Sequence, residues 1–237
     1  MTEDNLHTKV DLENGNPAFA KPVLCAGADF GGLISLYNED CLQALKRYDD
    51  NHFDIAIVDP PYGIGISSNP FRQKFEKCDW DNAIPNKQYF DELMRVSKNQ
   101  IIWGGNYFDL PPSQGFIIWD KKQPQDFSSA MCEMAWMSFQ KPAKIFRKHV
   151  VTAEPNKIHP TQKPIDLYAW ILLHYAEPNQ KLLDTHFGSG SIALAVDRAN
   201  RLDNMNLHLT ACEIDKEYID KAIKRISESI KQGTLSF

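Results

Sequence analysis

The sequence lacks the features of a secreted, membrane-spanning or metal-binding protein. It has five cysteines and no C-x-x-C pair: Cys25, Cys41, Cys78, Cys132 and Cys212. A scattered, odd set predicts reduced thiols, with neither a disulfide framework nor a zinc site. The N-terminus has no apolar signal-peptide core, and the most apolar helical stretch, 165–176, contains Asp166 and His174 and is too short to span a bilayer. We therefore expect a cytoplasmic protein that contacts no membrane and binds no metal.

The sequence also has no surplus of positive charge. Lys and Arg number 26 against 31 Asp and Glu, which gives a formal net charge of −5. An acidic total speaks against attraction to nucleic acid. The charge is unevenly spread, however: residues 141–163 hold six bases and one acid (+5), residues 63–78 hold three and one (+2), and residues 1–50 hold four and nine (−5). The two basic segments are either ordinary solvated faces or phosphate contacts, so DNA stays open as a partner.

The length and the order of apolar runs predict one α/β domain. A chain of 237 residues fits a single domain, 1–237, in which residues 1–30 form a loose lead-in because Asn, Gly and Pro interrupt any periodicity. Strands are expected at 33–37, 53–58, 101–103, 116–119, 134–138, 181–184 and 207–213, and helices at 41–48, 88–96, 164–175 (with Pro164 in the first turn), 191–199 and from 216 onward. The alternation predicts a mostly parallel sheet with helices on both faces.

A glycine-rich turn follows the strand that ends at Asp184. Gly188, Gly190 and Ala193 satisfy the loose dinucleotide-binding pattern, and Glu213 ends the next strand 23 positions after Gly190 (213 − 190), so an NAD site is one alternative. The Asp184 carboxylate would repel a pyrophosphate at the helix N-terminus and attract a cation. S-adenosylmethionine carries an ammonium, a sulfonium and a ribose diol but no phosphate, and it therefore fits this turn better.

A second strand end carries the tetrapeptide Asp59-Pro60-Pro61-Tyr62 (DPPY). The two prolines have no backbone N–H and leave the strand-end carbonyls as acceptors. Asp59 adds a carboxylate and Tyr62 a flat aromatic face. Two acceptors beside a stacking ring predict a receptor for the exocyclic amino group of a planar base.

Three elements together resemble the amino-group (N6-adenine/N4-cytosine) DNA methyltransferases: Asp59–Tyr62, the Asp184–Gly190 loop, and the H-P-T-Q-K-P segment of residues 159–164. The resemblance covers roughly residues 33–230. DPPY precedes the glycine loop, which is similar to the permuted β-type motif order. The resemblance implies a Rossmann-like methyltransferase fold with circularly permuted motifs, S-adenosylmethionine as methyl donor, and a flipped base in double-stranded DNA as acceptor.

The same resemblance assigns roles to individual residues. Asp59, Pro60 and Tyr62 would be catalytic, and Asp40, after the first strand, would accept a hydrogen bond from the cofactor's adenine. The residues expected to hold the cofactor are Asp40, Asp59, His159, Thr161, Lys163, Asp184, Phe187, Gly188, Gly190, Ser191 and Glu213. Segments 63–88 and 120–158 are expected to face DNA in place of a large recognition domain, with contacts from Arg72, Lys74, Lys77, Lys144, Arg147 and Lys148.

The expected mechanism is positioning plus electrostatics. The lone pair of an amino nitrogen on a base is delocalised into the ring, and hydrogen bonds to Asp59 and to the Pro60 carbonyl would localise it for in-line attack on the sulfonium methyl. Tyr62 would stack on the extruded base. No covalent enzyme intermediate is needed.

Several functions remain after this comparison. DPPY is more usual for adenine in the family, which favours N6-adenine methylation over N4-cytosine methylation, and an RNA substrate fits less well. A non-catalytic DNA-binding regulator and an NAD-dependent oxidoreductase are the alternatives from other classes. The resemblance is compatible with a homodimer and with an accompanying restriction endonuclease.

Overall fold

The computed structural model describes residues 24–30, 32–65, 83–124, 126, 130–149, 157–159 and 161–234. Within this part, nine strands form one sheet in the order β1-β2-β9-β8-β3-β4-β6-β5-β7. The strands are β1 (Leu24–Asp29), β2 (Ile34–Asn38), β3 (Phe53–Val58), β4 (Ser97–Trp103), β5 (Phe116–Asp120), β6 (Cys132–Met137), β7 (Lys144–Arg147), β8 (Lys181–Asp184) and β9 (His208–Glu213). Neighbours pair in parallel at β2–β9, β9–β8, β8–β3, β3–β4 and β5–β7, and antiparallel at β1–β2, β4–β6 and β6–β5. The prediction of a mostly parallel sheet is confirmed.

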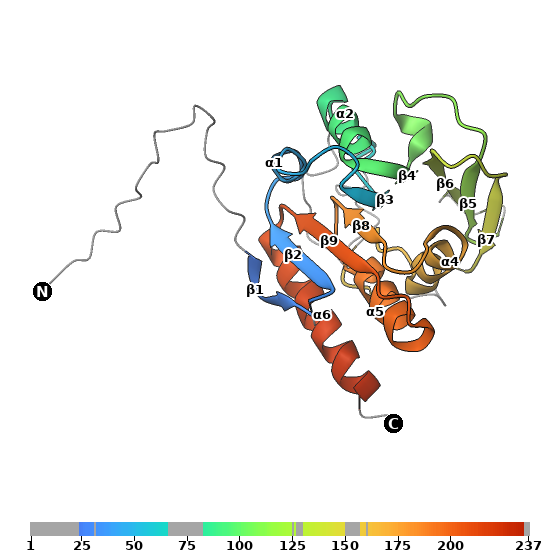
Figure 1. Cartoon of the computed structure of the whole chain (residues 1–237). Helices are drawn as coiled ribbons and strands as arrows, with labels where there is room; N and C mark the ends of the chain where they lie inside the picture. Colours follow the sequence, from blue (N-terminus) through green and yellow to red (C-terminus); the bar gives the residue numbers. More distant parts are fainter. Residues whose placement is uncertain are drawn as a thin grey trace, which may run out of the picture.

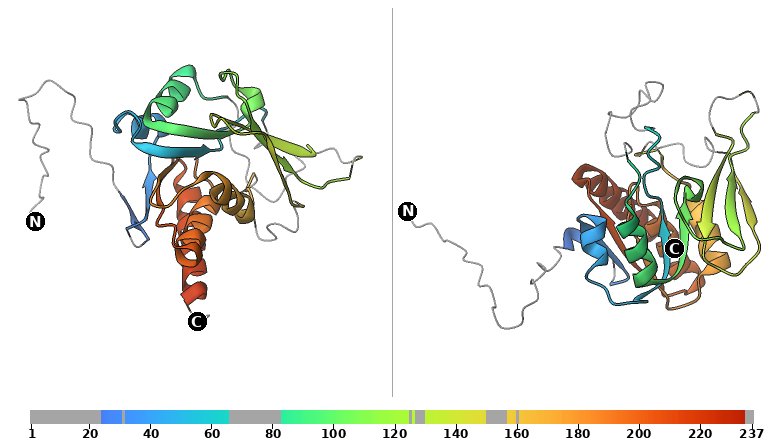
Figure 2. Two further views of the ribbon diagram at one scale, coloured as in Figure 1. Left: turned by 45° about the vertical axis from the view of Figure 1, so that its right-hand side comes forward. Right: turned by 90° about the horizontal axis from the view of Figure 1, so that it is seen from above.

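Helices cover both faces of the sheet (Figures 1 and 2). One face carries α1 (Cys41–Leu45) and α2 (Lys87–Val96), and the other carries α4 (Ile165–Tyr175), α5 (Ser191–Asp203) and α6 (Lys216–Thr234). A short 3₁₀ helix, η2 (Gly105–Tyr107), follows β4. The predicted α/β fold with two helical layers is therefore present.

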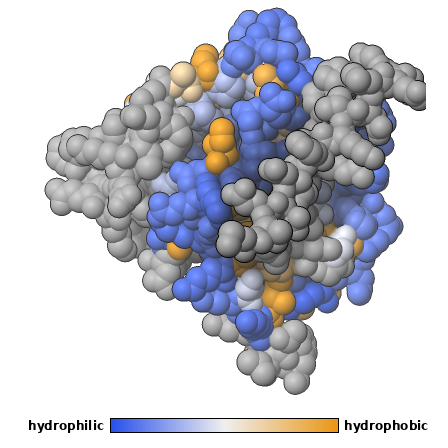
Figure 3. Space-filling model, turned by 90° about the vertical axis from the view of Figure 1, so that its left-hand side faces the viewer, coloured by the Kyte–Doolittle hydropathy of each residue, from blue (hydrophilic) through white to orange (hydrophobic). Residues whose placement is uncertain are grey.

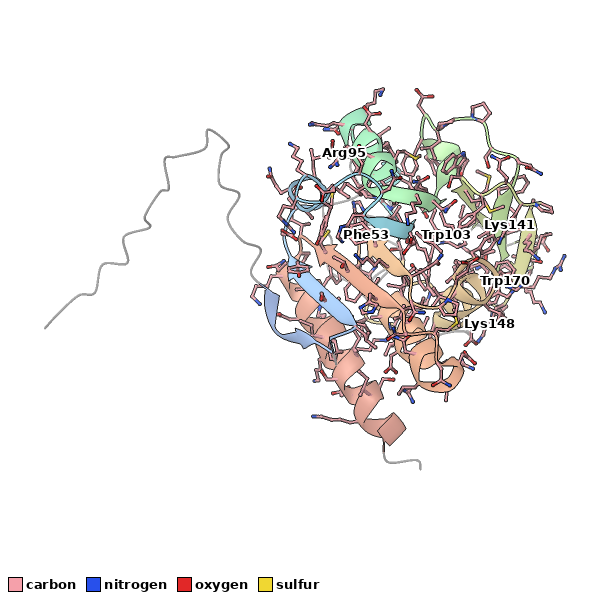
Figure 4. All side chains as sticks on the ribbon, viewed as in Figure 1. Phe53, Arg95, Trp103, Lys141, Lys148 and Trp170 are labelled. Atoms are coloured by element: carbon pink, nitrogen blue, oxygen red, sulfur yellow. The ribbon has the colours of Figure 1, made fainter. Side chains whose placement is uncertain are left out.

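The central strand β3 shows why its apolar run is continuous. Ile55 and Ile57 pack in the core cluster that contains α4, α5 and α6. Phe53, Ala56 and Val58 pack in the cluster that contains α1 and α2, and Figure 4 marks Phe53 on this strand. Side chains alternate between faces along Ile55–Val58, and helices cover both faces there, so this stretch is apolar at every position. The charged Asp54 lies near the start of the strand, where it pairs with Lys98.

The chain reverses its direction across the sheet between β8 and β3. The crossover through α2 carries β3 to β4 on one side, whereas the crossover through α5 carries β8 to β9 on the other. Ligands of open α/β sheets bind outside the carboxyl ends of the strands at such a switch point. The two strands that flank it end at Asp59 and Asp184, the acids that the sequence singled out.

Four expectations about local structure need correction. The lead-in 1–30 contains β1, which pairs with β2, and segment 120–158 contains the unpredicted strand β7 in addition to β6, which matches the strand expected at 134–138. The first helix ends at Leu45 instead of Tyr48. Pro164 is the N-cap of α4, with ψ at 142°, and lies just before the first turn. The sequence analysis missed the edge strands β1 and β7 because they form by pairing with strands elsewhere in the chain and have no local apolar pattern.

The surface gives no sign of a membrane segment among the residues described. The face shown in Figure 3 is largely hydrophilic, with hydrophobic residues scattered over it. In the described part of the chain no helix combines the length and the apolarity that a bilayer crossing requires. In the same part, no group of three or more His, Cys, Asp and Glu is placed to hold a metal ion.

Candidate functional site

A cavity of about 400 Å³ opens at the carboxyl ends of β3 and β8. Of the residues predicted to form the site, nine line it: Asp40, Asp59, His159, Thr161, Lys163, Phe187, Gly188, Ser191 and Glu213. The predicted residues Pro60, Tyr62, Asp184 and Gly190 are their neighbours in the chain but are not part of the lining. The fold therefore brings the DPPY turn, the glycine loop and the segment before α4 to one place.

Backbone hydrogen bonds tie the glycine loop to the end of β9. Glu213 accepts from the N–H of Gly188 at 2.8 Å through Oε2 and from the N–H of Asp215 at 3.0 Å through Oε1. The N–H of Phe187 donates to the Cys212 carbonyl at 3.1 Å. Burial raises the pKa of the Glu213 carboxyl, and these donors oppose the rise. Each Glu213 oxygen keeps a second lone pair that can accept from a ligand hydroxyl.

Gly190 ends the loop in a conformation that suits only glycine. Its φ is +72°, and a Cβ there would lie 3.0 Å from Cζ of Phe187 and 3.2 Å from Cδ1 of Ile226. We expect Gly190→Ala to lower the free energy of unfolding by about 2 kcal/mol or more, since the left-handed backbone alone costs about 1–2 kcal/mol.

Gly32 provides the matched control for this change. Its φ is +74°, but a Cβ there would meet no atom within 4 Å. Denaturant melts of Gly32→Ala measure the backbone cost by itself, and Gly190→Ala should lose clearly more. Equal losses would show that the Phe187 and Ile226 contacts contribute nothing.

Asp184 is buried at the end of β8, with 2% of its surface exposed. It accepts a hydrogen bond from the N–H of His186 at 3.0 Å. Burial raises the pKa of this carboxyl to about 8, and the nearby charges of Asp59 and Glu213 contribute to the rise. With a pKa near 8, the carboxyl of Asp184 is mostly protonated at neutral pH.

Asp59, Tyr62 and Lys163 form a closed triangle beside the cavity. The Tyr62 hydroxyl donates to Oδ1 of Asp59 at 2.7 Å, and the Lys163 ammonium forms an ion pair with Oδ2 of Asp59. Lys163 also donates to the Tyr62 hydroxyl at 3.3 Å. Burial raises the pKa of the Asp59 carboxyl, and the Lys163 charge opposes this.

The triangle continues into the sheet through Glu133 of β6. Glu133 pairs with Lys163 at 3.2 Å through one oxygen and with Lys121 at 2.7 Å through the other. Burial would raise the pKa of Glu133, but the two ammonium groups outweigh it and lower the pKa to about 2. Only 2% of the Lys163 side chain is exposed.

Aromatic rings surround Tyr62. The Tyr107 ring stacks on it with centroids 5.1 Å apart and an interplanar angle of 14°, and Phe108 meets it edge-on. Gly104 lies against it so closely that a Cβ would fall 2.3 Å from Cε1 of Tyr62. Tyr107 already provides one stacking partner for Tyr62, so the expected base stacking must use the other face or displace Tyr107.

The segment before α4 covers the glycine loop. His159 packs against the Tyr218 ring of α6 with centroids 4.4 Å apart, and its Nδ1 accepts from the N–H of Thr161 at 3.3 Å. The Gln162 side chain, 3% exposed, accepts from the N–H of Ile158 at 3.0 Å. Asp40 faces the cavity from the other side as the N-cap of α1, where it accepts from the N–H of Gln43 at 3.0 Å.

The predicted DNA contacts are only partly placed at this edge of the sheet. Arg72, Lys74 and Lys77 lie outside the described residues. β5 and β7 run parallel to β4, so Arg147 and Lys148 lie at the same edge as the cavity, whereas Lys144 begins β7 and lies about 10 Å further back. Arg147 pairs with Asp120 at 3.5 Å, and Lys148 pairs with Asp166 on the α4 side of the sheet (Figure 4).

Sequence reasoning missed several residues of the site. Cavity-lining positions to which it assigned no role are Cys41, Pro61, Gln162, Tyr168, Thr185, His186, Ser189, Ile214, Asp215 and Tyr218. Most of them adjoin predicted positions, so extending each motif by one or two residues would have found them. Glu133 and Lys121 adjoin none of the motifs, and only the pairing of β6 with its neighbours places them beside Lys163.

Comparison with known proteins gives a consistent result. A family model for N6/N4 methyltransferases, described as a DNA methylase, matches residues 118–224. The chain is 24% identical over 255 residues to the type II methyltransferase M.BglII of Bacillus subtilis, which covers 82% of this chain and 69% of that protein. It is 24% identical over 253 residues to the type II methyltransferase M.HinfI of Haemophilus influenzae, with 83% and 69% covered.

Solved structures share the fold. The M1.HpyAVI–SAM complex aligns with a TM-score of 0.54 and 19% identity over 80% of this chain and 98% of that one. The cytosine-N4-specific PvuII DNA methyltransferase aligns with a TM-score of 0.51 and 13% identity over 82% and 90%. The sheet of this chain is therefore the Rossmann-like sheet of these proteins, as the motifs predicted.

Proposed function

We propose that the chain is an amino-group DNA methyltransferase of the N6-adenine and N4-cytosine family and that it transfers a methyl group from S-adenosylmethionine to the N6 of a flipped adenine in double-stranded DNA. The observation that carries this proposal is the position of Asp59. Asp59 lines the same cavity as the glycine loop and Glu213. Acceptor groups for an amino group and a site for a small cationic cofactor thus adjoin each other.

The residues of the cavity fit S-adenosylmethionine. The volume of about 400 Å³ lies within the range of cofactor sites. Glu213 would accept hydrogen bonds from the ribose diol, Asp40 from the adenine amino group, and the glycine loop with Asp184 would hold the ammonium end. Phe187, Ser191, His159 and Thr161 would complete the walls. When bound, S-adenosylmethionine supplies the methyl group as a sulfonium substituent.

Asp59 and Pro60 would prepare the acceptor. Asp59 and the Pro60 carbonyl accept the two amino hydrogens of the base and shift the lone pair onto the nitrogen. Tyr62 holds the plane of the base by stacking and orients Asp59 through its hydroxyl, 2.7 Å from Oδ1. Both effects act by position and charge, without a covalent link to the enzyme.

The DNA would lie across the edge of the sheet at which the cavity opens. Arg147 and Lys148 lie along this edge, further from the cavity. Each pairs with a partly exposed carboxylate, Asp120 and Asp166 respectively. Phosphates would compete for the same guanidinium and ammonium groups. A homodimer and an accompanying restriction endonuclease stay predictions.

A product assay tests the proposal. The protein is incubated with methyl-labelled S-adenosylmethionine and mixed-sequence duplex DNA, and the DNA is digested to nucleosides. Label in N6-methyladenine supports the proposal, whereas label in N4-methylcytosine transfers it to cytosine. Bound cofactor with no label in DNA would overturn the catalytic assignment in favour of a regulator.

Binding of S-adenosylmethionine should strengthen with rising pH. Burial raises the pKa of Asp184 to about 8, so this acid must lose a proton to face a cation, and the affinity should rise by up to about tenfold per pH unit between pH 6 and 7.5. Isothermal titration in buffers of different protonation enthalpy should register the released proton. Asp184→Asn should bind weakly with little pH dependence, whereas Asp220→Asn, at an exposed position on α6, should behave as wild type. Wild-type affinity that is flat over this range would contradict the role of Asp184.

A further inference from the structure

A chain of four alternating charges runs from the end of β5 and the start of β6 to the cavity. In order they are Lys121, Glu133, Lys163 and Asp59, and neighbouring members form ion pairs. The exposed fractions of these side chains are 12%, 24%, 2% and 18%. The chain contains two cations and two carboxylates, so it is neutral as a whole. Buried charges persist only where they are paired in this way.

Each lysine of the chain also rests on a tryptophan. Lys163 Nζ lies 5.0 Å from the ring centroid of Trp103, at the end of β4, and Lys121 Nζ lies 5.3 Å from that of Trp119, on β5. Both tryptophans are buried, and Figure 4 shows Trp103 near the middle of the molecule. Cation–π contact with a fixed ring limits the directions in which the ammonium can move. Each ammonium is therefore held by the face of a tryptophan ring as well as by its carboxylate partners.

The donors of Lys163 are fully used within the protein. An ammonium has three N–H groups. The structure supplies three acceptors: Oδ2 of Asp59, Oε2 of Glu133 at 3.2 Å, and the Tyr62 hydroxyl at 3.3 Å. No donor is left over for a ligand, although Lys163 borders the cavity. This arrangement assigns Lys163 to Asp59 and Tyr62 in preference to the cofactor.

We propose that Glu133 is a positioning residue for the methyl-transfer reaction: its carboxylate fixes the Lys163 ammonium against Asp59, and Lys121 fixes Glu133 in turn. Without Glu133, Lys163 would lose one of its three acceptors, and its ammonium, still paired with Asp59, would no longer be held in one position against that carboxylate. Asp59 would then lose its fixed orientation toward the amino group of the base. The inference rests on the proposed function, because it takes Asp59 as the acceptor group.

The charge chain also has an electrostatic consequence. The titratable groups that face Asp59 from the surrounding elements are Tyr62 on its own turn, Glu133 of β6, Lys163 before α4, Tyr168 of α4 and Asp184 of β8. Burial raises the pKa of Asp59, Lys163 opposes this, and the negative charge of Glu133 raises it further. Removing the Glu133 charge should lower the pKa of Asp59, and removing the Lys121 charge should raise it.

Two variants with opposite expected effects test the proposal. In Glu133→Gln, single-turnover methyl transfer to DNA should fall on the order of 100-fold, with S-adenosylmethionine binding close to that of wild type. The acid limb of its pH–rate profile should move to lower pH by roughly one pH unit. Lys121→Gln should move the limb to higher pH, and the double variant should return it toward wild type, because the remaining pair is again neutral. If Glu133 and Lys121 had only a structural role, both variants would transfer methyl groups more slowly, but their acid limbs would not move in opposite directions.

Glu228→Gln is the matched control, since Glu228 is exposed on α6 and pairs with Lys224 of the same helix at 4.0 Å. If Glu133→Gln equals this control in rate and in pH profile, the inference is overturned. If Glu133→Gln does not fold, Lys121→Gln decides: a limb at higher pH supports the inference, and an unchanged limb overturns it. A wild-type protein that methylates no DNA contradicts the proposed function itself, and the two failures are thus distinguishable.

Discussion

Replacing Asp59 by Ala should reduce methyl transfer to DNA by about 1,000-fold or more while S-adenosylmethionine still binds. Removing a preorganised group that stabilises the reacting centre costs on the order of 100- to 1,000-fold. Asp59 accepts from the base and also anchors Tyr62 and Lys163 through its two oxygens. Both the acceptor and the orientation of the aromatic ring are lost together. The glycine loop and Glu213 line the same cavity and keep their mutual hydrogen bond, in which Asp59 takes no part.

Single-turnover rates and calorimetric binding constants measure the two effects separately. Asp59→Asn should fall between wild type and Asp59→Ala, because the amide oxygen still accepts one hydrogen bond but carries no charge for Lys163. Asp91→Ala on α2 is the control, because Asp91 is exposed and pairs with Lys87 of the same helix. If Asp59→Ala transfers methyl groups at the rate of this control, the assignment of Asp59 as a catalytic residue is wrong.

Lys163→Met should be the most destabilising change at the site. The substitution leaves Asp59 without its ion pair and removes one of the two cations that face Glu133. Breaking a buried pair costs about 3–5 kcal/mol, which corresponds to a fall of roughly 10 °C in Tm for a chain of this size. Methyl transfer should fall as well, since Asp59 and Tyr62 lose their shared donor.

The size of this effect should depend on pH with a definite sign. The ammonium groups hold the pKa of Glu133 at about 2 in the folded protein, against about 4.5 for a free glutamate. The stability that comes from ionised Glu133 is therefore fully present above about pH 4.5 and is lost as the pH falls toward 2. The gap between wild type and Lys163→Met should be widest at neutral pH and should narrow over that window.

Thermal melts across this pH range test the prediction. Lys98→Met is the matched control, because Lys98 is half-exposed and pairs with Asp54 at 2.7 Å on the surface. An exposed pair of this kind contributes less than about 1 kcal/mol. Equal melting curves for the two variants, or a Lys163→Met deficit that does not change with pH, would contradict the view that buried charge pairing stabilises this site.

The two strands that carry the site, β3 and β8, could be predicted because the centre of the sheet is buried on both faces. The runs 53–58 and 181–184 match β3 and β8 residue for residue. Helices cover both faces of the sheet at its centre, so the stretches Ile55–Val58 and Leu182–Leu183 are apolar without interruption, and an aspartate marks the end of each. The glycine loop was predictable for a related reason, since the backbone at Gly190 has a φ of +72° that few other residues adopt.

Local sequence could not predict the edge of the sheet or the second layer of the site. β1 and β7 are created by pairing with partners elsewhere in the chain, and β7 alternates between half-buried and exposed residues with no continuous apolar run. Glu133 and Lys121 belong to no motif and are separated from Lys163 by 30 and 42 positions (163 − 133 and 163 − 121). Their importance follows from strand register, which decides which side chains meet across the sheet.

The fold class and the two strand ends that meet at the cavity could be predicted from the order of residues along the chain, as could the hypothesis of an amino-group acceptor beside a cationic cofactor. These predictions depend on residue types and short spacings. The way in which Asp59 is held could be seen only in the folded protein. Ion pairing among buried groups depends on distance in space, and packing of β4, β5, β6 and the segment before α4 sets that distance. The position of positive charge also depends on the fold. The net charge of −5 does not reveal that Arg147 and Lys148 lie at the edge where the cavity opens, to which the parallel direction of β7 brings them.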